Sequence, residues 1–109
     1  MSYSNELEER IGNVITGWEN ISFKKMFGGI CHLLNGNMFA GVYKDYLILR
    51  LGEKGAKKAL KLNHIRPMDI TGKPMKGWVM VGQAEIKNER ELEEWLKKAR
   101  KFVKTLPVK

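Results

Sequence analysis

Residues 25–51 read KMFGGICHLLNGNMFAGVYKDYLILRL, and this stretch decides the fold. Its apolar and β-favouring residues fall into three runs: Gly29–Leu34, Met38–Tyr43 and Tyr46–Leu51. The first gap holds Asn35 and Gly36, the pair that most readily takes the positive φ angles of a tight hairpin turn. The second gap is equally short and holds Lys44 and Asp45. The pattern therefore predicts three antiparallel strands in a meander.

The segment Met26–Gly29, at the start of this stretch, has two explanations. A glycine pair lets a backbone approach a ligand phosphate closely, or it marks a bend or bulge in a strand. The sequence has neither the spacing of a phosphate-binding loop nor the Lys-Ser/Thr pair that follows one. We therefore expect a bend or bulge.

A helix is predicted near each end of the chain. From Asn5 to Trp18, five apolar residues recur at helical spacing and share one face. Near the C-terminus, Asn88 and Glu91 have the spacing of an N-terminal cap. An apolar stripe then continues to Leu106, and Pro107 ends the helix.

Shorter elements fill the rest of the chain. Ile21–Lys25 is predicted to be an extended lead-in to the meander, and residues 63–78 form a loop with brief extended pieces because proline and glycine interrupt them. Trp78–Val81 is predicted to be a further strand, with Met75 as its earliest starting point. Three tryptophans fall on apolar faces and are predicted to pack together in the core: Trp18, Trp78 and Trp95.

Residues 52–62, GEKGAKKALKL, predict a short helix with a cationic face. Four lysines recur at i, i+3, i+4 and i+7 and share that face: Lys54, Lys57, Lys58 and Lys61. A solvated face is the ordinary explanation, but like charges at this spacing repel, which favours an anionic partner. The last helix ends in a second basic set that its dipole also explains: Lys97, Lys101 and Lys104.

Length and charge set the limits on function. The 109 residues suffice for one domain, residues 1–109. A net charge of +8 attracts polyanions, although it also suits a merely soluble surface. Cys31 is the only cysteine, which fits a reducing cytoplasm. The first ten residues lack signal-peptide features, and no apolar run approaches the ~20 residues of a membrane span. We expect a cytoplasmic protein without a membrane partner.

Residue chemistry points away from catalysis. His32 and His64 are the only imidazoles, and neither has further metal ligands nearby in the sequence. Cys31 and His32 are adjacent on a predicted strand, so their side chains point to opposite faces; we expect a buried cysteine beside a partly exposed histidine. The carboxylates lie in the first turns of helices or in tight turns, where interactions with the helix dipole and local turn preferences account for them. We predict no catalytic residues, no metal and no cofactor.

Several motifs together resemble the N-terminal domain of TfoX, the bacterial competence regulator also called Sxy. They occur in the family's order, over roughly Glu6 to Phe102: Met26–Gly29, Asn35–Phe39, Gly72–Met75 and Trp95. The resemblance implies an α+β fold of two layers, in which an N-terminal helix leads into an antiparallel meander with further strands and helices pack on one face. It also implies similarity to secretion chaperones, which are often dimeric.

The resemblance implies less about function than about the fold. The role in competence transcription belongs to proteins with a second, helical C-terminal domain, and the resemblance covers the first domain alone, as in a stand-alone member. The family has no established catalytic residues, so none are transferred. We expect a non-enzymatic regulatory or adaptor domain that binds a protein partner, with DNA as a further candidate held by the two lysine sets.

Two alternatives remain open. The first is a chaperone-like homodimer with no nucleic-acid role, which uses a free strand edge or an exposed apolar sheet face. The second is an enzyme acting on a small anionic ligand, which a deep pocket combining His64, Arg66 and Lys73 would favour.

Overall fold

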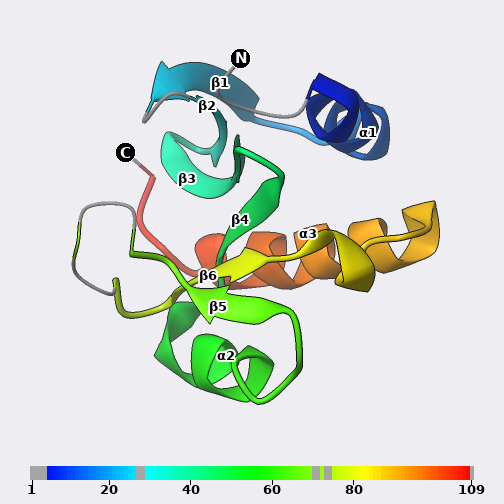
Figure 1. The fold of residues 1–109 in the computed structure, drawn as a ribbon. Coiled ribbons are helices and arrows are strands. Elements are labelled where there is room, and N and C mark those ends of the chain that lie inside the picture. The colour runs from blue at the N-terminus through cyan, green and yellow to red at the C-terminus, as the bar shows by residue number, and fades with distance from the viewer. Residues whose placement is uncertain (1–4, 27–28, 70–71, 73–74, 109) are drawn as a thin grey trace.

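A computed structural model describes residues 5–26, 29–69, 72 and 75–108 (Figure 1). The strands are β1 (Ile21–Met26), β2 (Gly29–Leu34), β3 (Asn37–Tyr43), β4 (Tyr46–Arg50), β5 (Ile65–Pro67) and β6 (Trp78–Val81). The helices are α1 (Asn5–Ile15), α2 (Gly52–Ala59), the short 3-10 helix η1 (Gln83–Glu85) and α3 (Glu89–Val103). The strands form one antiparallel sheet in the order β1-β2-β3-β4-β6-β5. The predicted α+β fold is confirmed.

The meander follows its turn chemistry. Asn35 and Gly36 have φ angles of 54° and 83°, as the two central residues of a type I′ turn require. The predicted lead-in is a full strand, because β1 pairs with β2 along its whole length. A Cβ at Gly29 would overlap the carbonyl oxygen of Val42, so glycine is required there by strand packing. Phe27 and Gly28 of the predicted bend lie outside the described residues.

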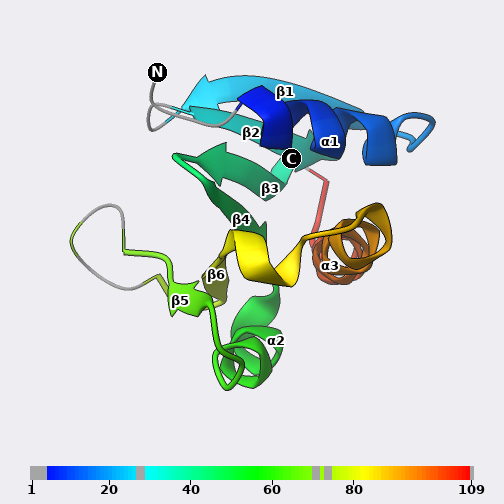
Figure 2. The ribbon, with the colours of Figure 1, turned by 45° about the vertical axis from the view of Figure 1, so that its right-hand side comes forward.

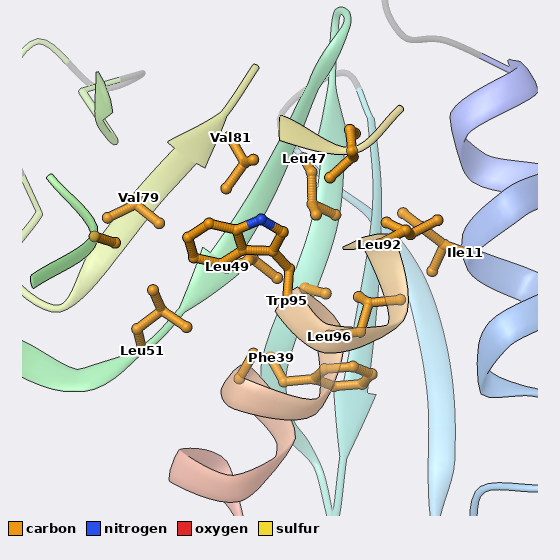
Figure 3. Packing of buried hydrophobic residues seen from close by; sticks show 14 of the residues in the cluster. Ile11, Phe39, Leu47, Leu49, Leu51, Val79, Val81, Leu92, Trp95 and Leu96 are labelled. Carbon is orange, nitrogen blue, oxygen red and sulfur yellow. The ribbon is translucent and has the colours of Figure 1, made fainter. Parts of the chain in front are cut away.

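The main core lies between the sheet and the helices. Figure 2 shows α1 and α3 on the same side of the sheet, with α2 at its end. In Figure 3 the indole of Trp95 lies over β4 and β6, beside Leu49 and Val79, while Leu96 and Leu92 point toward Phe39 and α1. Alternation along each strand places these side chains on one face, because successive residues point to opposite sides of a sheet.

The opposite face of the sheet carries a smaller apolar cluster. Ile48, Met68 and Met80 are buried there, and Trp78 packs against them. The prediction that the three tryptophans pack together was therefore wrong: Trp78 alternates with Val79, so its ring lies on the far side of the sheet from Trp95. The prediction that β6 begins as early as Met75 was also wrong, because Met75 precedes the strand and packs on this second cluster.

Arg10 ties α1 to the start of α3, and Asn88 caps α3 itself. Arg10 on α1 donates to the carboxylate of Glu89 at 2.7 Å and to the carbonyl of Ile86 at 2.6 Å. The predicted cap at the start of α3 is confirmed, since Asn88 Oδ1 accepts from the backbone N–H of Glu91 at 2.9 Å.

Within the described residues, no helix has the length and apolar character needed to cross a membrane.

The junction between β4 and α2 depends on Gly52. Its φ angle is 80°, in the region that favours glycine, and a Cβ there would lie 2.6 Å from the Phe102 ring of α3. The N–H groups of Leu51 and Gly52 both donate to the carbonyl of Gly77, at 2.8 and 3.1 Å. This junction fixes where α2 lies relative to α3.

We predict that Gly52→Ala lowers the free energy of unfolding by about 1–3 kcal/mol, because it adds backbone strain and a clash with Phe102. Gly12→Ala on α1 is the matched control. A Cβ at Gly12 meets no atom within 4 Å, so this change is expected to raise stability by about 0.5–1 kcal/mol. Urea unfolding of both variants measures the difference, and equal stability would contradict the proposed role of Gly52.

Candidate functional site

A groove of about 380 Å³ lies between α2 and α3. Its lining combines apolar side chains with three lysines: Leu51, Gly55, Lys58, Ala59, Leu62, Trp95, Lys98 and Lys101. We call this the α2–α3 groove. It brings together residues from the end of β4, from α2 and the turn after it, and from the second half of α3.

The floor of the groove is apolar because small residues face it from α2. Gly55 and Ala59 are four residues apart and lie on one side of that helix. Neither side chain is large enough to fill the space toward α3, so Trp95 and Leu51 form the floor beneath the gap. Leu62 lies at the lip and is 47% exposed, which leaves its side chain accessible at the surface.

The rim of the groove is cationic. Lys58 projects from α2, whereas Lys98 and Lys101 project from α3, and all three are exposed. The ammonium of Lys98 lies 4.5 Å from the centre of the Trp95 ring, in a cation–π contact. Among the residues that the structure describes, none of the three is within ion-pair distance of a carboxylate.

The charge changes sign along α3. A second hollow adjoins the groove at Trp95 and Lys98, and its other lining residues are acidic: Glu85, Glu91 and Glu94. Acidic residues near the start of a helix and basic residues near its end both match the helix dipole. The basic groove therefore ends sharply at Lys98.

The predicted α2 lysines do not all face one surface. Lys57 lines a different hollow, of about 310 Å³, on the other side of α2 with Lys76 and Trp78. Lys61 lies beyond the end of α2, in the turn that follows, because the helix stops at Ala59 rather than continuing to residue 62. Lys54 is exposed on α2 but does not line the groove.

The predicted α3 lysines also lie on different surfaces. Lys101 lines the groove, while Lys97 is exposed at 3.9 Å from Glu93 and Lys104 caps the end of the helix. Lys98 was not among the predicted site residues, although the structure places it on the rim of the groove. The sequence could have identified it, because Lys98 follows Trp95 by three residues and this spacing puts both side chains on one helix face.

His32 is not the partly exposed residue that was predicted. It is 5% exposed, and its Nε2 atom lies 3.0 Å from a carboxylate oxygen of Glu8 on α1. The error arises because α1 covers this part of β2, a long-range contact. The pair fastens α1 to the sheet and leaves the imidazole no access to a substrate.

Cys31 is buried, as predicted, on the sheet face opposite His32. Burial, and secondarily the charge of Glu8, raise the pKa of the Cys31 thiol. A raised pKa keeps the thiol protonated at neutral pH, which makes it a poor nucleophile. Within the described residues, no three His, Cys, Asp or Glu side chains form a group that could hold a metal ion.

We predict that iodoacetamide modifies Cys31 more than about tenfold more slowly in the native protein at pH 8 than in 8 M urea, because alkylation needs local opening and a thiolate. The raised pKa also means that the unfolded chain releases this proton first, so stability falls as the pH rises through about 9. Equal alkylation rates in the two states would contradict the burial.

His64 and Arg66 do meet at one surface, an open hollow of about 520 Å³. Tyr46, Asp45 and Gln83 also line it, and Arg66 donates to the Tyr46 hydroxyl at 3.2 Å. Lys73, the third residue considered for a small-anion pocket, lies outside the described residues. Asp45 also lines this hollow, and its negative charge opposes the binding of an anion.

A model of the TfoX N-terminal domain matches residues 13–103. The chain belongs to the TfoX N-terminal domain family. The matched region contains the whole of β1 to β6, α2 and α3, and so includes every residue that lines the α2–α3 groove. No curated protein and no solved structure matches the chain at a significant level.

In this TfoX N-terminal domain, the floor and the rim of the groove differ in their structural role. We predict that Trp95→Ala lowers the free energy of unfolding by about 3–5 kcal/mol, because it opens a cavity in the main core. The double change Lys58→Gln and Lys98→Gln alters exposed side chains and removes the cation–π contact of Lys98, so the loss is expected to stay within about 1 kcal/mol. Chemical denaturation tests both, and a large loss in the lysine variant would give the rim a structural role.

Proposed function

We propose that this TfoX N-terminal domain is a non-enzymatic regulatory or adaptor domain that binds an acidic region of another protein through the α2–α3 groove. One observation carries the proposal: three lysines without an acidic neighbour at ion-pair distance, within the described residues, surround an apolar floor. The floor favours a partner that buries apolar side chains, and the rim favours one that carries carboxylates.

The apolar floor favours a protein over DNA. Contacts to DNA phosphates need only cationic and polar groups, and protein–DNA interfaces are more polar than protein–protein interfaces. Trp95 and Leu62 contribute nothing to phosphate binding, whereas tryptophan is enriched among the residues that dominate protein interfaces. DNA binding by the other lysines, including Lys54, Lys61, Lys97 and Lys104, is a competing outcome of the test below.

The family and the chemistry of the cysteine support a proposal for the cellular role and location of this protein. TfoX proteins regulate competence, so a role in transcription or competence control is proposed for this chain through its partner. A single, buried and unpaired cysteine fits a cytoplasmic location. A second copy of the chain is an additional candidate partner, which the same experiment would detect by the mass of the product.

The test is site-specific photo-crosslinking in cells that produce the protein naturally. We predict that a benzophenone amino acid at Leu62 yields a discrete, protease-sensitive adduct. Phe23 on β1 is the matched control position, because it is 67% exposed and apolar but far along the sheet from the groove. The adduct from position 62 is expected to disappear when Lys58→Glu and Lys98→Glu are combined.

Three results would contradict the proposal. An adduct that nuclease removes would assign the surface to nucleic acid. Equal labelling from positions 23 and 62 would mean that the adduct reflects exposure alone. An adduct unaffected by the two charge reversals would remove the lysines from the interface.

A further inference from the structure

We infer that the α2–α3 groove takes an acidic amphipathic α-helix of about two turns. The inference rests on the proposed function and names the form of the partner. It follows from where the charges lie, from what the floor lacks and from the length of the walls.

The charges lie on both sides of the floor. Lys58 forms one wall, and Lys98 and Lys101 form the other. A matching ligand therefore carries an apolar stripe with carboxylates on both of its flanks. An amphipathic helix presents this arrangement, because residues three and four apart share its buried face and the residues beside them point outward.

The side chains of the floor offer no hydrogen-bond acceptor to a ligand backbone, because the indole of Trp95 can only donate. Leu51, Ala59 and Leu62 offer apolar side chains, and lysine ammonium groups donate hydrogen bonds but cannot accept them. An extended segment laid there would leave its backbone N–H groups unpaired, at a cost for each buried one. A helix pairs backbone N–H and C=O groups internally, so it leaves fewer of them unpaired in the groove than an extended segment does.

The length of the walls sets the length of the helix. The eight residues of α2 span about 12 Å at 1.5 Å per residue, which equals roughly two turns of a partner helix. Such a segment presents apolar anchors at i, i+4 and i+7, the spacing by which helices recognise grooves. The acidic hollow beyond Lys98 repels carboxylates, so the acidic residues of the ligand must gather toward Lys58 and Lys101.

A designed peptide pair tests the inference directly. The first is a stapled helix with leucine at i, i+4 and i+7 and glutamate beside them. The second is also stapled and has the same composition, but its leucines are spread around the helix. We expect the first to bind at least about tenfold more tightly at physiological salt, a difference of about 1.4 kcal/mol, and to shift the Trp95 indole resonance in ¹⁵N spectra while the Trp18 resonance moves less.

Charge-matched variants separate a specific site from general attraction. Combining Lys58→Glu with Lys98→Glu lowers the net charge of +8 by 4, to +4, and so does combining Lys24→Glu with Lys25→Glu on β1. All four lysines are exposed, so both variants are expected to fold. Affinity for the amphipathic peptide should fall at least about tenfold in the first variant and less than about twofold in the second.

The outcomes that overturn the inference are distinct from those that overturn the proposed function. Equal binding of the two peptides, or equal losses in the two variants, would show attraction by charge alone. Tighter binding of a 20-base-pair duplex DNA probe at the same salt, lost in the Lys58/Lys98 variant, would assign the groove to nucleic acid. Absence of peptide binding, with persistent crosslinking from position 62, would retain a protein partner but exclude an acidic helix.

Discussion

The packing of the Phe102 ring against the backbone of Gly52 is the constraint on which the rest of this surface depends. It joins the end of β4, the start of α2 and the end of α3 at one point, and the two N–H groups that donate to Gly77 attach the β6 side of the sheet to the same point. The groove exists because the two helices meet at one end, whereas Gly55 and Ala59 further along α2 are too small to fill the space toward α3.

Local signals accounted for most of the elements. The Asn35-Gly36 turn and the Asn88 cap each act over a few residues, so their outcome is contained in the sequence beside them. Long-range contacts were the source of the errors. The burial of His32 depends on Glu8 of a helix that precedes it by more than twenty residues, and no local pattern reveals that α1 covers β2. The position of Trp78 was predictable in principle, because alternation along β6 separates it from Val79.

In the candidate site, too, local sequence signals were predictive and long-range packing was not. The periodicity of the lysines in residues 52–62 identified a cationic helix, but helix ends and packing decide which surface each lysine reaches. Lys57 and Lys58 are adjacent in sequence and line hollows on opposite sides of α2. The α3 half of the groove, Lys98 above all, comes from tertiary packing of two elements that are about forty residues apart. Charge patterning along one helix therefore predicted that a basic surface exists, but not its shape.

The segregation of charge along α3 also affects how the domain moves in solution. Glutamates at the start of the helix and lysines at its end contribute an electric dipole moment along that axis. In the field of a negatively charged partner, such a molecule turns its lysine-bearing end forward before contact, which raises the fraction of collisions that are productive. The effect operates over roughly one Debye length, about 8 Å at physiological ionic strength, so it orients the last step of the approach.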